Sequence, residues 1–221
     1  MKRGRIHAHT RLLLVAATLG SVLWALLMFK PVMASSQPLP VELINNLRLG
    51  GYVIVFRHGA TVSDQSHIDS MSRNNGPAAR QLNEQGRAQA KSIGESMRKL
   101  KIPVASVLTS TIQRALETGK LLGFGQVTAT ADLAEGGPEA SPDENDRRAK
   151  AFRKLVGELP PADNNVVIVS HKPNIVDAFG KDWSDVREGE ASIFEPNGEG
   201  GYKLVIRVQA DAWTELARVS N

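Results

Sequence analysis

The chain has 221 residues, 42% of them hydrophobic, no cysteine and a formal net charge of +4 at pH 7. Residues 1–34 hold five of the 27 Lys and Arg and none of the acids, which leaves 22 basic and 23 acidic residues, a net charge of −1, for the rest. The basic balance therefore gives no argument for a nucleic-acid partner, and the lack of cysteine excludes a thiol nucleophile, cysteine-ligated zinc and disulfides.

Residues 1–34 have the pattern of an export signal. Four basic residues, the last of them Arg11, precede an apolar run without a polar face from Leu12 to Phe29, and small residues at a signal-peptidase site follow in Val32-Met33-Ala34. The run is 18 residues long, which also suffices to span a bilayer, so a retained signal anchor is the alternative to cleavage. Because positive residues stay inside, either alternative places the remainder in the periplasm or outside the cell, with membrane contact only through residues 12–29 if the segment is uncleaved.

After a short linker at residues 35–40, we expect a single domain at residues 41–221, which is long enough to bury a core. Hydrophobic periodicity and turn residues predict the following elements. Helices are expected at residues 41–49, 84–101, 110–123 and 142–159, and strands at residues 51–58, 104–109, 127–131, 165–171, 191–195 and 202–208. Strands that alternate with helices indicate an α/β three-layer sandwich with a mostly parallel sheet, in which the last two strands form an antiparallel pair at one edge.

Two of the helix starts match a capping box, a serine that accepts a bond from a backbone N–H three residues later. One is Ser110-Thr111-Ile112-Gln113, and the other is Ser141-Pro142-Asp143-Glu144, with proline at the first helical position. The buried face of the second helix is expected to comprise four residues, Ala149, Phe152, Val156 and Leu159. That of the helix at residues 84–101 is expected to include Ile93, Met97 and Leu100.

Two of the predicted strands are nearly continuous β-branched runs, typical of strands covered on both faces, and each ends on a histidine. The first runs through Val53-Ile54-Val55-Phe56 to Arg57-His58-Gly59, and the second runs from Asn165 to Ser170-His171. In open α/β sheets the ligand crevice lies at the carboxyl ends of the strands. Arg57, His58 and His171 are therefore expected at one edge of the sheet.

This set of residues suits the hydrolysis of a phosphate monoester. Arginine binds the non-bridging oxygens through two parallel hydrogen bonds, and Arg57 and Arg114 are the candidates. Arg114 would lie in the first turn of a helix, where free N–H groups also favour an anion. A neutral histidine can act as a nucleophile and form a covalent phosphoenzyme. The third-ligand spacing of a zinc site is not visible, so we expect neither a metal nor a cofactor.

The sequence resembles the histidine phosphatase superfamily, also called phosphoglycerate mutase-like. The resemblance rests on five motifs that occur in family order between about residues 51 and 208. They are Arg57-His58-Gly59, Leu82-Asn83-Glu84-Gln85-Gly86-Arg87-Ala88-Gln89-Ala90, Ser110 to Ala115 with Thr118, Ser170-His171, and Gly189-Glu190-Ala191.

The resemblance implies a role for each site residue. His58 is the nucleophile, while Arg57, Arg114 and His171 hold the phosphate, with Thr61 as a further phosphate ligand. Glu135 is the implied proton donor.

The sequence departs from the family pattern at two places. The family often has Glu after the Arg-His-Gly motif and Asn several residues later, where this chain has Ala60 and Asp64. Lys172 follows the second histidine, where the acid-phosphatase branch has Asp, so the proton donor should lie elsewhere. Asp132 and Asp64 remain alternatives to Glu135.

Together these features predict an exported phosphomonoesterase that acts through a phosphohistidine on His58. The alternative is a catalytically weak module of the same fold that binds a phosphate ligand or an envelope partner. The substrate stays open between an envelope phosphosugar, a small phosphometabolite and a phosphoprotein, because the segments that would select it, residues 61–80 and 136–141, carry no interpretable pattern.

Overall fold

The computed structural model of the chain describes residues 41–62, 80–136 and 141–219. The predicted export signal, the linker and most of the predicted loop at residues 61–80 lie outside these ranges, and the domain boundaries stay predictions. Within the described ranges, no helix is both long enough and apolar enough to cross a membrane.

A six-stranded sheet in the order β3-β2-β4-β1-β5-β6 forms the centre of the domain. The strands are β1 (Val53–Arg57), β2 (Val104–Ser110), β3 (Val127–Thr130), β4 (Asn165–Ser170), β5 (Ala191–Pro196) and β6 (Tyr202–Val208). β1 pairs in parallel with β4, β4 with β2, and β2 with β3. The only antiparallel strand of this sheet is β5, which pairs with β1 on one side and with the edge strand β6 on the other. The predicted sandwich with a mostly parallel sheet is confirmed.

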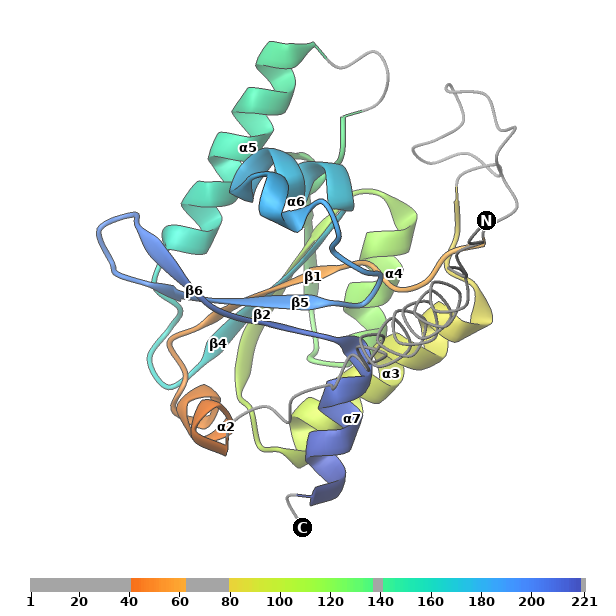
Figure 1. The fold of residues 1–221 in the computed structure, drawn as a ribbon, viewed down its shortest axis with the longest axis vertical. Coiled ribbons are helices and arrows are strands. Elements are labelled where there is room, and N and C mark those ends of the chain that lie inside the picture. The colour runs from red at the N-terminus through yellow and green to blue at the C-terminus, as the bar shows by residue number, and fades with distance from the viewer. Residues whose placement is uncertain (1–40, 63–79, 137–140, 220–221) are drawn as a thin grey trace, which may run out of the picture. The chain divides into compact units, whose positions relative to one another are not determined.

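Helices cover both faces of the sheet (Figure 1). They are α2 (Val41–Leu49), α3 (Glu84–Lys99), α4 (Gln113–Leu122), α5 (Pro142–Gly157), α6 (Lys172–Phe179) and α7 (Ala210–Val219). Apolar residues of α2, α3, α4 and α7 pack against one face, and those of α5 and α6 pack against the other. The described part of the chain also contains two short 3₁₀ helices, η2 (Ala131–Leu133) and η3 (Lys181–Trp183).

The alternation of side chains along β1 explains why this strand reads as a continuous apolar run. Ile54 and Phe56 belong to the core under α3 and α7, whereas Val53 and Val55 belong to the core under α5 and α6. All four are at most 1% exposed, because successive side chains of a strand point to opposite faces. A strand covered on both faces therefore carries no polar residue until it reaches its end.

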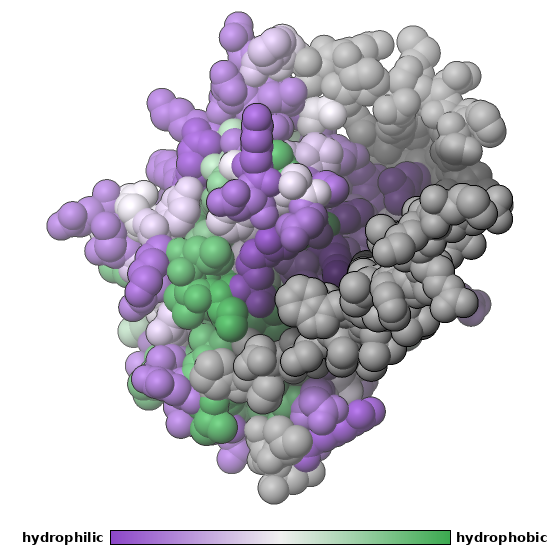
Figure 2. Space-filling view, viewed as in Figure 1, coloured by the Kyte–Doolittle hydropathy of each residue, from purple (hydrophilic) through white to green (hydrophobic). Residues whose placement is uncertain are grey.

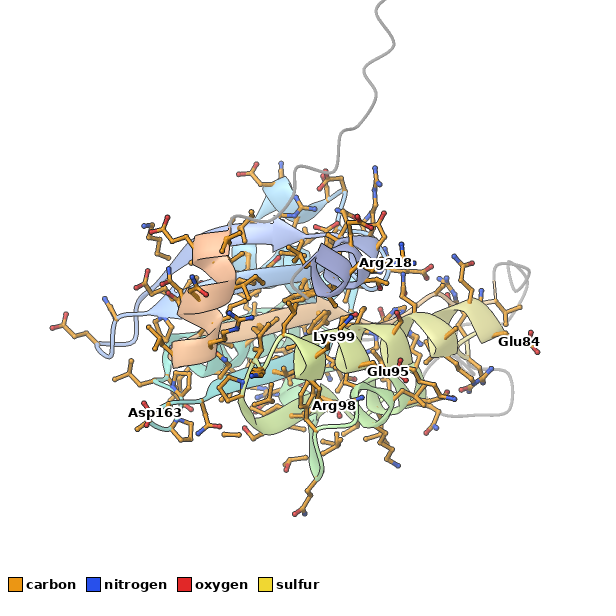
Figure 3. All side chains as sticks on the ribbon, turned by 90° about the horizontal axis from the view of Figure 1, so that it is seen from below. Glu84, Glu95, Arg98, Lys99, Asp163 and Arg218 are labelled. Atoms are coloured by element: carbon orange, nitrogen blue, oxygen red, sulfur yellow. The ribbon has the colours of Figure 1, made fainter. Side chains whose placement is uncertain are left out.

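The helices show the complementary pattern, with one buried face and one face in solvent. In α3, Ile93 and Met97 are buried, as predicted, while Glu95 and Lys99 lie on the outer side of the helix (Figure 3). The surface over α5 is mainly hydrophilic (Figure 2). These amphipathic faces orient the helices on the sheet.

Two details of the sequence prediction are wrong. Ser110 does not cap a helix: it is the last residue of β2, and α4 begins after Ile112, which makes no side-chain cap bond. Leu159 is not on the buried face of α5, because the helix ends at Gly157 and the Leu159 side chain is 63% exposed. The Ser141 cap is confirmed, with its side chain accepting a bond from the Glu144 N–H. Neither α6 nor α7 was predicted from the sequence.

The start of α3 lies directly against the segment that follows β1. A side-chain carbon added at Gly86 would overlap the backbone N and O of Ala60, and one added at Gly59 would lie 2.8 Å from the carbonyl oxygen of Gly86. The two glycines thus allow two backbones to approach closely. This contact fixes the position of the chain just beyond the end of β1.

Candidate active site

The two predicted histidines lie side by side at the carboxyl end of the sheet. His58 directly follows β1 and His171 directly follows β4, and these two strands pair in parallel with Arg57 opposite Ser170. The ring centroids of the histidines are 5.3 Å apart. Both side chains are almost fully buried, at 4% and 0% exposed. The sequence prediction that two strand ends form one site agrees with this placement.

The hydrogen bonds of His58 indicate which ring nitrogen is free to react. Nδ1 lies 2.8 Å from the carbonyl oxygen of Gly59, which can only accept, so Nδ1 carries the proton. Nε2 therefore has a lone pair, and it accepts a bond of 3.2 Å from Nε of Arg114. The turn itself is held by Thr118, whose hydroxyl accepts from the Gly59 N–H and donates to the Arg114 carbonyl. The lone pair on Nε2 of His58 thus faces a guanidinium.

Both rings are held in the neutral form. Burial lowers the pKa of His58 to about 3, the bond to the Gly59 carbonyl partly opposes this, and the guanidinium of Arg114 lowers it further. Burial also lowers the pKa of His171 well below its usual value, and His58 and Arg114 add to the effect. A neutral imidazole is the form that can attack phosphorus, so no neighbouring base is needed to generate it.

Arg114 extends from the first turn of α4 into the space between the histidines and Glu135. Its side chain is 5% exposed and forms a short ion pair with Oε1 of Glu135. The second carboxylate oxygen, Oε2, lies 4.0 Å from Nδ1 of His171. Arg114 therefore contacts the proposed nucleophile and the proposed proton donor at the same time.

The backbone that carries Glu135 is held by donors from three other elements. Oγ of Ser170 donates to the carbonyl of Leu133 at 2.9 Å, and Nδ2 of Asn174 donates to that of Ala134 at 2.9 Å. Nη1 of Arg148 donates to the carbonyl of Glu135 itself at 3.1 Å. Because these partners come from β4, α6 and α5, Glu135 is positioned by the fold and not by its own loop.

Arg57, the second predicted phosphate ligand, is the last residue of β1, and its partners lie in the segment before β5. Its Nη1 donates to the carbonyl of Val186 at 2.9 Å, while its buried Nε has no partner in the described residues. Thr61 lies nearby, with its hydroxyl donating to Glu188 and accepting a bond from Arg80. The structure thus places Thr61 at the margin of the site, in contact with side chains that surround Arg57.

The two alternative proton donors differ in what the structure describes. The carboxylate of Asp132 is engaged on the surface by Arg147, at 2.6 Å. Only its backbone carbonyl faces Asn174, at 3.4 Å. Asp64 lies outside the described residues. Of these two described acids, Glu135 is the one whose carboxylate pairs with Arg114 and lies 4.0 Å from His171.

Comparison with known proteins agrees with this geometry. Residues 53–138 match the model of the histidine phosphatase superfamily, branch 1. Over these residues the chain is similar to the histidine phosphatase superfamily. No curated protein sequence matches the chain.

Solved structures of two phosphatases share the fold at low sequence identity. The protein histidine phosphatase SixA, complexed with tungstate, is 16% identical with a TM-score of 0.52, over 72% of this chain and 97% of SixA. A mycobacterial glucosyl-3-phosphoglycerate phosphatase in complex with VO₃ is 19% identical with a TM-score of 0.51, over 71% of this chain and 98% of that protein. At such identities the likeness establishes the fold.

Glu188 is a residue of the candidate site that sequence analysis missed. Its Oε1 accepts a bond of 2.9 Å from the Thr61 hydroxyl and lies 3.4 Å from Arg57 and 3.8 Å from Arg80. The carboxylate therefore offsets part of the positive charge around Arg57. These partners are 127, 131 and 108 residues away in the sequence, so no local pattern could have indicated the contact.

Among the described residues, no group of three or more His, Asp or Glu side chains is placed to hold a metal ion. The charged groups that act on His58 are the guanidiniums of Arg114, Arg57 and Arg80, and Arg114 is paired with the carboxylate of Glu135.

The burial of neutral His58 predicts a loss of stability in acid. Its pKa is lower in the folded state than in the unfolded chain, where it is about 6.5, so the unfolded chain takes up more protons between these values. The stabilisation is complete above about pH 6.5 and is lost as the pH falls toward 3. Between pH 7 and pH 5, His58 should account for a loss of about 2 kcal/mol in the free energy of unfolding.

Denaturant unfolding of the wild type and of His58→Asn at the two pH values measures this term. The variant should lose about 2 kcal/mol less than the wild type. Equal losses in both proteins would show that His58 is not held neutral by the fold.

Proposed function

We propose that this chain is an exported, metal-independent phosphomonoesterase that transfers the phosphoryl group to Nε2 of His58. One observation carries the proposal: His58 is a buried, neutral histidine whose Nδ1 is bonded to the Gly59 carbonyl, so that the lone pair on Nε2 faces Arg114. A histidine that served only in packing would need no such orientation toward a cation. The match of residues 53–138 to the superfamily model and the fold shared with phosphatases support the activity.

In the first step, Nε2 of His58 forms a bond to phosphorus while the ester P–O bond breaks. Arg57, Arg114 and His171 stabilise the negative charge on the non-bridging oxygens, which is the main demand that phosphoryl transfer makes on a protein. The leaving alkoxide takes a proton from Glu135. The products of this step are the alcohol and the phosphohistidine.

In the second step, water attacks the phosphohistidine on the same face. The Glu135 carboxylate, which gave up its proton in the first step, accepts one from the water. The N–P bond breaks, inorganic phosphate leaves, and neutral His58 is restored. The two steps together hydrolyse one ester bond and leave the protein unchanged.

The Arg114–Glu135 ion pair supports the proton-donor role of Glu135. A bound phosphate would compete with the carboxylate for the guanidinium of Arg114 and would place a second negative charge beside it. Substrate binding would thus free the Glu135 carboxyl group to approach the leaving-group oxygen.

His58→Ala should abolish turnover, by more than about 10³-fold, because it removes the nucleophile. Rapid quenching of the wild type under conditions that preserve phosphohistidine, followed by mass spectrometry, should locate phosphate on His58. Circular dichroism shows whether the variant is folded. A folded His58→Ala protein with full activity, or a phosphoryl group on another residue, would overturn the mechanism.

The same assay tests metal independence. We expect enzyme dialysed against EDTA to retain its rate, because two guanidiniums and a helix N-terminus supply the positive charge. If chelation removes the activity and zinc or magnesium restores it, the mechanism proposed here is wrong.

The substrate class would be identified with a panel of phosphosugars, nucleotides and phosphopeptides. The panel is extended to phosphohistidine peptides and glucosyl-3-phosphoglycerate, the groups named for the two structural neighbours.

Glu135→Gln should slow the hydrolysis of alkyl phosphates by about 10²–10⁴-fold, the range expected for a lost general acid. p-Nitrophenyl phosphate should be affected much less, because its leaving group needs no proton. Asp132→Asn is the matched control, because Asp132 lies three residues before Glu135 and its carboxylate is bound to Arg147. If Asp132→Asn shows the leaving-group dependence and Glu135→Gln does not, the donor has been misassigned.

The proposed export rests on the basic residues that precede the apolar run at residues 12–29. A reporter fused after Asn221 should be active only when it is translocated, and N-terminal sequencing should show whether the chain begins after Ala34 or is retained in full. Replacing the basic residues before the apolar run by glutamine should reduce the fraction of the reporter that is translocated, because these residues orient the run in the membrane. They are Lys2, Arg3, Arg5 and Arg11. A reporter that works only in the cytoplasm would contradict export.

A further inference from the structure

Ser110, which sequence analysis took for a helix cap, contacts the active site instead. It is the last residue of β2 and is fully buried. Its Oγ accepts a hydrogen bond of 3.0 Å from the backbone N–H of Ile112 and lies 2.8 Å from Nε2 of His171. The Ser110 hydroxyl therefore contacts Nε2 of His171, whereas Glu135 lies near the other ring nitrogen, Nδ1.

The number of protons in this cluster limits its arrangement. A serine hydroxyl has one proton to donate, and the Ile112 N–H already occupies one of its acceptor positions. In the described residues, the remaining partner of Oγ is Nε2 of His171. If Ser110 donates its proton to Nε2, that nitrogen must be unprotonated. Neutral His171 then carries its proton on Nδ1.

The surroundings of Nδ1 favour the same tautomer. Among the described residues, the buried Nδ1 of His171 has no hydrogen-bond partner, and Oε2 of Glu135 lies 4.0 Å from it. A bare lone pair there would face the carboxylate and the oxygens of an arriving phosphate, both of which repel it. An N–H group would be attracted to both. The other charged or titratable groups that affect this ring are His58, Arg114 and Arg57.

We propose that Ser110 is a positioning residue that holds His171 in the Nδ1-protonated tautomer, so that the ring donates a hydrogen bond to the transferring phosphoryl group. The proposal rests on the proposed function for the phosphoryl acceptor, but the tautomer itself is a property of the free protein. Ser110 touches no reacting atom. It acts by deciding which nitrogen of His171 has a proton to offer.

The chain supplies a matched control one residue earlier. Thr109 is also in β2 and fully buried, and its hydroxyl has no hydrogen-bond partner in the described residues. Thr109→Val replaces a hydroxyl by a methyl group in the same strand, while Ser110→Ala removes a hydroxyl that is bonded to His171. A general effect of altering buried hydroxyls in β2 would appear in both variants.

The test combines ¹⁵N NMR of the histidine rings with steady-state kinetics on the full-length protein. In the wild type, Nδ1 of His171 should be protonated and Nε2 should be an acceptor. Ser110→Ala should move the proton wholly or partly to Nε2 and lower kcat by about 10- to 100-fold, the usual effect of losing a group that orients a ring from behind. Thr109→Val should change neither.

A wild-type His171 protonated on Nε2 would overturn the proposal, and this measurement needs no variant to fold. So would a Ser110→Ala protein that keeps the wild-type tautomer, or one whose kcat falls no more than that of Thr109→Val. Failure of the proposed function gives a different result. A fully active His58→Ala protein would overturn the phosphohistidine mechanism, whereas the tautomer of His171 is measured independently in the wild-type protein.

Discussion

The parallel pairing of β1 with β4 is the constraint on which the site depends. It sets Arg57 opposite Ser170, so the next residue of each strand, His58 and His171, must meet at the same edge. Both strands are covered by helices on both faces, which fixes their register because a slip of one residue would exchange the two cores. The histidines are therefore positioned by the hydrophobic core.

Burial then determines the chemistry of these side chains. Removal from water keeps both imidazoles neutral, and a neutral His58 retains the lone pair that a cationic ring would lack. The same burial makes each guanidinium dependent on a nearby carboxylate, which Glu135 supplies to Arg114 and Glu188 to Arg57. A phosphate would take the place of these carboxylates, so the free site already contains groups that imitate the charge of its ligand.

The sequence predicted those features that depend on local pattern. Continuous apolar strands ending in His58 and His171 indicated the sheet edge, and Arg114 was expected one turn beyond another strand. Contacts that depend on the tertiary fold could not be predicted this way. Glu188 meets Arg57 across 131 residues, and Ser110 has the sequence of a helix cap but bonds to a histidine 61 residues away. The helix α7 was missed because its hydrophobic pattern extends over only 10 residues. Its Trp213 is nevertheless fully buried in the core.

A crystal structure of the protein with orthovanadate tests the central claim most directly, because this anion imitates the phosphoryl group in transfer. The account predicts vanadium bonded to Nε2 of His58, with its oxygens bound by Arg57, Arg114 and Nδ1 of His171, and the Glu135 carboxylate displaced from Arg114 toward the leaving-group position. Vanadate bound away from His58, or held through a metal ion, would contradict it.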